Sequence, residues 1–102
     1  MRFGDYYKIL TDGQIIGGFI IFRKKQAEYE LGRIFIDSDF QNQGIGLQAF
    51  AFIWQTYPLA KRWTLGTPAW NQRNRHFYQK VGFCEVGTEP PDGIRFEKRI
   101  TR

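Results

Sequence analysis

The first third of the chain carries three runs of apolar residues with polar turns between them. Asp5 to Thr11 is predicted to form a strand, Asp12-Gly13 a hairpin turn, and Gln14 to Arg23 the partner strand. Gly17-Gly18 inside the second run indicates a bulge or the close approach of another main chain. A third strand is predicted over Glu28 to Ile36, and three antiparallel strands in a meander are the simplest arrangement.

The middle of the chain changes from strand-like runs to a helical pattern. Apolar residues recur at three- and four-residue spacing from Leu47 to Tyr57, and Pro58 ends this helix. The apolar stripe is broad, because Phe52 and Ile53 widen it. A helix that is apolar around most of its circumference is expected to be covered on more than one side.

The remainder of the chain predicts a strand, a second helix and two more strands. These elements are expected at Arg62 to Thr67, at Asn71 to Val81 with Gly82 as the helix stop, at Phe83 to Thr88 and at Ile94 to Ile100. The order predicts an α+β fold in which a mixed, mostly antiparallel sheet is flanked by helices.

The composition fits one globular domain over residues 1–102. Hydrophobic residues make up 42% of the chain and aromatic residues 18%, so a core can form and disorder is not expected. The lone Cys84 excludes an internal disulfide and a cysteine-based zinc cluster, and we expect it to be partly buried beside Phe83. No metal site is predicted.

Neither a leader nor a membrane span is indicated by the sequence. No hydrophobic leader follows Met1, and the long uncharged segment from Phe40 to Ala60 is interrupted by amides and by Pro58. We therefore expect a cytoplasmic protein with no membrane partner.

The chain is basic, with a net charge of +5. A basic surface suits nucleic acid, and it equally suits a small polyanion such as a nucleotide-bearing cofactor. The charges are scattered, and no arginine-rich helix or zinc-finger spacing occurs. A nucleic-acid-binding domain is thus an alternative that the charge pattern does not favour.

Two glycines stand directly before the first predicted helix, in the stretch "FQNQGIGLQAF". Because Gly44 and Gly46 lack a Cβ, they can adopt positive φ and allow another group to approach the main chain. The first N–H groups of a helix are unpaired and carry partial positive charge, which suits a phosphate. Alternatively, the glycines only let the helix pack closely on the sheet.

Two familiar phosphate-binding motifs do not fit this turn. A P-loop requires Lys followed by Ser or Thr, and neither pair follows Gly46. The dinucleotide fingerprint requires its first glycine directly after a strand and an acidic residue about 20 positions on. Here Asp37 to Gln43 intervene before Gly44, and Thr64 to Trp70 contains no acid.

A third motif fits better. Gln41-x-x-Gly44-x-Gly46 resembles the [Q/R]-x-x-G-x-[G/A] signature of the GNAT superfamily of acyl-CoA-dependent N-acetyltransferases. Asn71 to Phe83, "NQRNRHFYQKVGF", resembles the N-x-x-A-x-x-x-Y-x-x-x-G-F segment of the same superfamily. Both motifs occur in order, each after a predicted strand, and the resemblance covers nearly the whole chain.

The resemblance implies a GNAT-like fold with acetyl-CoA as co-substrate. It implies that the pyrophosphate is bound by the main chain of Gln41, Asn42, Gln43, Gly44, Ile45, Gly46 and Leu47. It further implies that the pantetheine arm is bound like an added strand by the main chain of Ile34, Phe35 and Ile36, and that the cofactor is also contacted by Asn71 and Asn74.

The loop departs from the family in lacking a basic side chain. Members of the superfamily often carry Arg, Gly and Arg or Lys at the positions of Gln41, Asn42 and Gln43. Arg73 or Arg75 is a candidate for the missing cation; alternatively, both are simply solvated. Ala is usual at the position of Asn74, so crowding is possible at that contact.

Tyr78 is the predicted general acid. Helical geometry places Asn71, Asn74 and Tyr78 on one face, so a face that binds the cofactor would also present the phenol to the departing thiolate. The alternative is a core ring whose hydroxyl bonds to the backbone. The lone His76 is expected to be exposed rather than to act as the base.

Glu30 is the predicted general base. It resembles in position a strand glutamate that serves as base in the histone-modifying branch of the family. Two-residue alternation predicts that one face of the strand carries Glu30, Gly32, Ile34 and Ile36. An N–H near Phe35 or Ile36 is a candidate to polarise the thioester carbonyl. Alternatively, Glu30 is a surface carboxylate.

The predicted reaction is direct attack of a primary amine on acetyl-CoA, without a covalent enzyme intermediate. Family members normally carry a first strand and two helices before the hairpin that opens this chain, so the resemblance implies an N-terminally short member. Apolar sheet surface left exposed usually finds a partner, which predicts a homo-oligomer, most simply a dimer. An acyl-CoA-binding module with little or no activity is the alternative function.

Overall fold

The computed structural model describes residues 4–100, and within them the predicted order of elements is confirmed. The elements are β1 (Gly4–Thr11), β2 (Gln14–Arg23), β3 (Glu28–Ile36), η1 (Ser38–Phe40), α1 (Ile45–Thr56), β4 (Arg62–Pro68), α2 (Gln72–Lys80), β5 (Cys84–Glu89) and β6 (Gly93–Arg99). Each predicted strand and helix is present, with ends that differ by at most two residues. The short 3₁₀ turn η1 was not predicted; the Asp37 side chain begins it by accepting the N–H of Asp39 at 3.0 Å.

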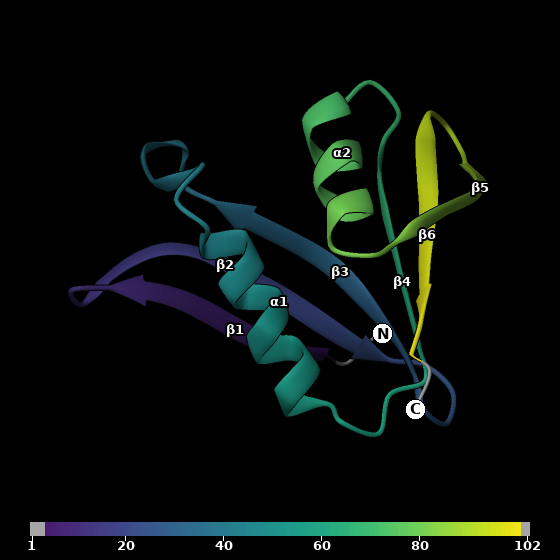
Figure 1. Cartoon of the computed structure of the whole chain (residues 1–102), viewed down its shortest axis with the longest axis horizontal. Coiled ribbons are helices and arrows are strands. Elements are labelled where there is room, and N and C mark those ends of the chain that lie inside the picture. Colours follow the sequence, from purple (N-terminus) through teal and green to yellow (C-terminus); the bar gives the residue numbers. More distant parts are fainter. Residues whose placement is uncertain (1–3, 101–102) are drawn as a thin grey trace.

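The six strands form one sheet in the order β1-β2-β3-β4-β6-β5. Neighbouring strands are antiparallel except for β3 and β4, which are parallel and pair only between Glu28–Glu30 and Arg62–Thr64. Beyond those residues the two strands diverge, so the sheet opens like a V (Figure 1). The predicted mixed, mostly antiparallel sheet is confirmed.

Glycines make the close strand contacts possible in the first hairpin. Asp12 and Gly13 both have positive φ, as a two-residue hairpin turn requires. A Cβ added at Gly17 would collide with the main-chain carbonyl of Phe35, and one at Gly18 would lie 3.0 Å from the carbonyl oxygen of Tyr7. The predicted close approach at these two glycines is confirmed.

A bulge in β3 changes which of its residues share a face. The pairing register between β2 and β3 shifts by one residue at Gly32, and such a bulge interrupts the two-residue alternation. Ile34 packs against the core, whereas Glu30 lies on the opposite face, because its neighbours Tyr29 and Leu31 point toward the core. The prediction of one shared face is therefore wrong for the set Glu30, Gly32, Ile34 and Ile36.

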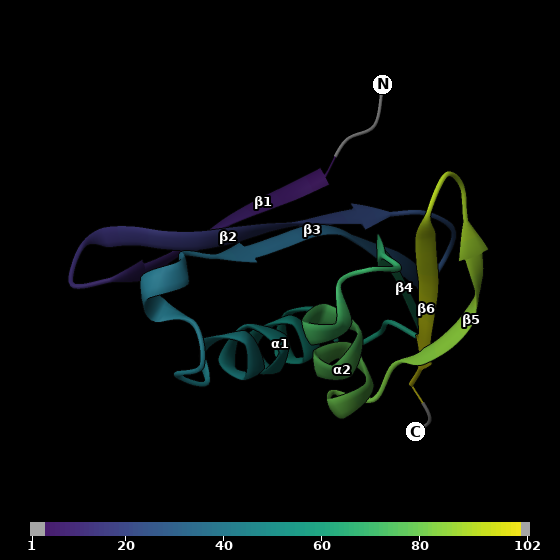
Figure 2. The ribbon, with the colours of Figure 1, turned by 90° about the horizontal axis from the view of Figure 1, so that it is seen from above.

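Both helices cover the same face of the sheet (Figure 2). The core lies between them and the strands, and its most deeply buried large side chains are Trp63, Phe96, Ile21 and Ile53. α1 is covered by the sheet on one side and on another by Phe77 of α2 and by Phe83, which precedes β5, since Phe50 contacts both rings. Coverage of this broad apolar helix on more than one side was predicted.

The expectation that Cys84 is partly buried is wrong. Its side chain is exposed, because β5 is an edge strand and each of its residues is solvent-accessible. Within residues 4–100, neither helix is long and apolar enough to cross a membrane.

Candidate functional site

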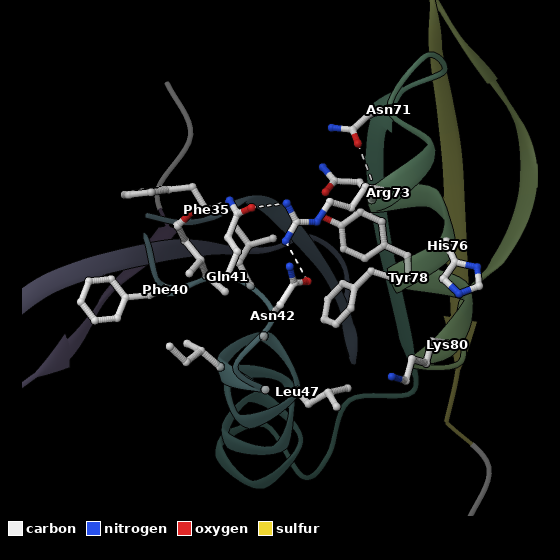
Figure 3. A pocket seen from close by; sticks show the side chains of 17 residues that line it. Phe35, Phe40, Gln41, Asn42, Leu47, Asn71, Arg73, His76, Tyr78 and Lys80 are labelled. Atoms are coloured by element: carbon white, nitrogen blue, oxygen red, sulfur yellow. Dashed lines mark hydrogen bonds between the residues drawn. The ribbon is translucent and has the colours of Figure 1, made fainter. Parts of the chain in front are cut away.

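A cavity of about 660 Å³ lies where β3 and β4 diverge, on the helix side of the sheet (Figure 3). Its walls are the end of β3, the loop before α1, the first turn of α1 and one side of α2. The structure brings all of the predicted cofactor residues to this cavity except Gln43: the lining includes Ile34, Phe35, Ile36, Gln41, Asn42, Gly44, Ile45, Gly46, Leu47, Asn71, Asn74 and Tyr78.

The glycine turn presents the unpaired start of α1 to the cavity. Gly44 is the N-cap residue, with a left-handed backbone (φ 77°) and no side-chain cap. The first intrahelical bond is donated by the N–H of Gln48 to the Gly44 carbonyl, so the N–H groups of Ile45, Gly46 and Leu47 have no acceptor within the helix. These donors and the helix dipole favour an anion at this point.

Asn42 also has a left-handed backbone, with φ 65°. Asparagine tolerates this conformation better than most residues, and glycine tolerates it best. The family preference for glycine at this position therefore has a conformational reason, and Asn42 meets the same requirement. Gln43 turns toward Asp39, whose carbonyl its side-chain amide contacts at 3.4 Å, so its side chain lies outside the cavity.

Gln41 connects the two sides of the cavity. Its Nε2 donates to the Ile36 carbonyl at 2.9 Å, and its Oε1 accepts a hydrogen bond from Arg73 on α2. Arg73 also donates to Asn42 Oδ1 at 3.2 Å. Arg73 thus supplies the cation that the loop itself lacks.

The other candidate cation, Arg75, has a structural role. Its guanidinium pairs with Glu85 at 2.9 Å and donates to the Ala69 carbonyl at 2.8 Å. Arg75 does not line the cavity. Of the two arginines singled out in the sequence, only Arg73 reaches the phosphate-binding loop.

The end of β3 offers main-chain groups to the gap between the strands. The N–H of Asp37 donates to Ile16 in β2 at 2.7 Å. Because main-chain groups of successive strand residues point to opposite edges, the groups of Ile36 and Ile34 point away from β2 and into the gap. Here β4 no longer pairs with β3, so this edge is available to an extended ligand.

Asn71, Asn74 and Tyr78 lie on one face of α2, as predicted, and all three line the cavity. The Asn71 side chain caps the helix by accepting the N–H of Asn74 at 3.0 Å. The Asn74 amide in turn lies 3.4 Å from Thr67 Oγ1, so it is accommodated without displacing the helix from β4.

Tyr78 is 5% exposed and forms part of the cavity floor. Its ring packs against Phe50, Phe83 and Phe96. Within the described residues its hydroxyl makes no hydrogen bond. Burial raises the pKa of Tyr78 to about 12, so the phenol stays protonated at neutral pH.

Glu30 is not part of this cavity. The bulge at Gly32 turns its carboxylate to the face of the sheet that neither helix covers, and Lys24 lies 3.7 Å from it. It is nevertheless the last residue of β3 that pairs with β4 before the strands diverge. A glycine inside a strand, here Gly32, often marks a bulge of this kind.

Sequence reasoning missed three lining residues: Phe40, Phe77 and Lys80. Lys80 follows Arg73 by seven residues, a spacing that returns to the same helix face and would have revealed it. His76 is exposed, as expected, and lies at the rim.

Comparison with known proteins agrees with this geometry. Residues 3–85 match the family model described as the acetyltransferase (GNAT) domain. Uncharacterized protein YrkN of Bacillus subtilis (strain 168) is 35% identical over 79 residues, which are 76% of this chain and 43% of that protein. The chain therefore spans less than half the length of this relative.

Two solved structures have the same fold. An acetyltransferase from Thermus thermophilus superposes with a TM-score of 0.88 at 18% identity, over 97% of this chain and 65% of that one. A GNAT family acetyltransferase from Elizabethkingia anophelis, solved with acetyl-CoA bound, superposes with a TM-score of 0.80 at 22% identity, over 95% and 76% of the two chains. The GNAT motifs, the V-shaped sheet and the match to the family model together show that this chain belongs to the GNAT acetyltransferase family.

Proposed function

We propose that the chain transfers an acetyl group from acetyl-CoA to a primary amine by direct attack. The observation that carries the proposal is that one cavity brings three features together. It is lined by the start of α1 with its unpaired N–H groups, by the end of β3 where pairing with β4 has stopped, and by Tyr78. A diphosphate, an extended amide-containing arm and a thioester would meet these three parts in that order.

The residues present fit such a ligand. The N–H groups of Ile45, Gly46 and Leu47, with Arg73, provide donors for a diphosphate. The main-chain groups of Ile34 and the N–H of Ile36 provide partners for an extended arm, as in the addition of a strand to a sheet, whereas the Ile36 carbonyl is already bonded to Gln41. The bound thioester would supply an activated acyl group. Among the lining side chains, the Tyr78 phenol is the proposed proton donor.

Tyr78 suits the role of general acid for the departing thiolate. Its hydroxyl has no competing partner in the described part of the chain, and its raised pKa keeps it in the protonated form that a general acid requires at neutral pH. An N–H at Ile36, which points into the gap, is the candidate to polarise the carbonyl.

The amine is proposed to arrive from the opposite face of the sheet, through the gap between β3 and β4. Glu30 stands beside the closed corner of that gap and remains the predicted base, acting from the open face. An unchanged rate in a Glu30→Gln variant would remove it from the mechanism.

The position of Glu30 outside the cavity also favours the second candidate, an acyl-CoA-binding module with little activity. Calorimetry with acetyl-CoA tests what both candidates share, and a thiol-release assay over a panel of primary amines then separates them. Binding with turnover supports the transferase, and binding without turnover on every amine supports the module. Absence of binding would overturn both.

We further propose that the chain forms a homodimer through the uncovered face of β1–β3. That face carries exposed apolar side chains, including Tyr6 at 78%, Leu10 at 58% and Phe35 at 57% exposure. Exposed apolar surface of this kind usually marks an interaction site. Sedimentation equilibrium is the test, and a monomer at micromolar concentration would contradict the proposal.

A further inference from the structure

The basic residues of the chain differ in whether a carboxylate accompanies them. Among the described residues, carboxylates pair with Arg23, Lys24, Arg62, Arg75 and Arg99. Arg73 has only neutral partners, the side-chain amides of Gln41 and Asn42. Lys80 makes no hydrogen bond or ion pair within residues 4–100. Two cations of α2 are therefore left without an anion, and both line the cavity.

Arg73 and Lys80 face the cavity from the same side of α2. Seven residues are about two helical turns, so the two attachment points are about 10 Å apart along the axis. In Figure 3 the Lys80 side chain extends toward Leu47 at the start of α1, while Arg73 reaches Gln41 and Asn42. The ring of His76 points away from that loop (Figure 3).

The charge of the cavity is of one sign. Among the described residues that line it, none is Asp or Glu, whereas Arg73 and Lys80 are cations. Lys80 also stands in the last turn of α2, where a positive charge stabilises the helix dipole. That role accounts for a positive charge at position 80. It does not account for a side chain that lines a cavity in which Arg73 already supplies a positive charge.

We propose that Arg73 and Lys80 bind two different anionic groups of one nucleotide ligand. Arg73 binds the diphosphate at the start of α1, and Lys80 binds a phosphate on the ribose beyond it. The inference rests on the proposed function, because coenzyme A carries both a diphosphate and a ribose 3′-phosphate. It follows that the chain selects coenzyme A over 3′-dephospho-coenzyme A and that Lys80 makes the selection.

Calorimetric titration with these two compounds tests the inference directly. The proteins are the wild type, Lys80→Gln and a matched control, Lys25→Gln, which removes the same charge from an exposed position outside the cavity. Wild type and Lys25→Gln are expected to bind coenzyme A up to about fivefold more tightly than the dephospho compound, the upper end of the range for an exposed ion pair. Lys80→Gln is expected to bind both compounds equally, at the dephospho level, and Lys80→Arg to keep the preference. Thermal unfolding of each variant establishes that it is folded.

The outcomes separate this inference from the proposal on which it rests. Equal affinity of the wild type for the two compounds would overturn the inference and leave the proposed function intact. The same conclusion would follow if Lys80→Gln weakened the binding of both compounds by the same factor. Failure of the wild type to bind either compound would overturn the proposed function, and this inference with it.

Discussion

The ring of Phe77 on α2 occupies the space where Gly46 on α1 would carry a side chain. A Cβ at Gly46 would lie 2.8 Å from Phe77 Cζ, closer than real contacts allow. Gly46 does not have positive φ, whereas Gly44 does, and nothing lies within 4 Å of a Cβ added at Gly44. The two glycines therefore serve different needs: Gly44 adopts the turn, and Gly46 lets the two helices meet.

Gly46→Ala is expected to lower the free energy of unfolding by about 1–3 kcal/mol, since the added methyl group displaces the Phe77 ring. Gly44→Ala is expected to cost about 1–2 kcal/mol through its left-handed backbone alone. Urea unfolding of each variant, alone and combined with Phe77→Leu, distinguishes the causes. The smaller side chain is expected to relieve Gly46→Ala and not Gly44→Ala; equal relief of both would contradict the packing explanation.

Tyr78→Phe is expected to lower kcat by roughly 10²–10⁴, the usual contribution of a general acid, with little change in affinity for acetyl-CoA. The ring is retained, so its contacts in the core persist. Steady-state kinetics and calorimetry measure the two quantities. Tyr29→Phe is the control, because that ring packs on Trp63 away from the cavity. A normal kcat in Tyr78→Phe would exclude the phenol as the acid.

Burial of Tyr78 also predicts how stability depends on pH. The phenol ionises near pH 10 in the unfolded chain, whereas in the folded protein its pKa is raised to about 12. The folded state thus holds the proton more tightly, so this contribution is fully present below pH 10 and is lost as the pH rises toward 12. The slope is expected to reach at most about 1.4 kcal/mol per pH unit.

Urea unfolding at several pH values between 9 and about 12 measures this slope. Tyr57, whose pKa is also raised by burial, contributes in the same direction, so the comparison is between wild type and Tyr78→Phe. The variant is expected to lose stability less steeply than the wild type. If the free energy of unfolding fell equally steeply with pH in the wild type and in Tyr78→Phe, Tyr78 would have the same pKa in the folded and unfolded states.

Arg73 and Arg75 form a matched pair on one helix. Arg73→Gln is expected to weaken acetyl-CoA binding about three- to thirtyfold, and more so at low salt, because it removes the cation that α2 places beside the phosphate-binding loop. Arg75→Gln is expected to leave binding unchanged and to lower stability by about 0.5–1 kcal/mol through loss of its pair with Glu85. Calorimetry and thermal unfolding report the two effects, and a reversal of them would contradict the assignment.

Much of the fold could be predicted because local patterns agreed with the final structure. The apolar stripe of α1, the turn at Asp12-Gly13 and the stop at Gly82 each specify one local conformation. The motif residues reached the cavity for the same reason, since helix periodicity fixes the common face of Asn71, Asn74 and Tyr78.

The face of Glu30 could not be predicted in this way. A glycine inside a strand is compatible with regular pairing or with a bulge, and the partner strand decides between them. The role of Arg73 likewise depends on a contact between segments 31 residues apart, which no local pattern specifies. Tertiary pairing, rather than residue preference, determined both outcomes.

The bonds from Arg73 to Gln41 and Asn42 have a thermodynamic consequence. They make the loop an internal competitor for the guanidinium, and a phosphate must displace these amides before it can use the same donors. Each amide bond given up offsets about 0.5–1.5 kcal/mol of the new contact. The affinity lost on removing Arg73 is therefore a net quantity. It equals the attraction between Arg73 and the ligand minus the free energy of the two amide bonds that Arg73 makes when no ligand is bound.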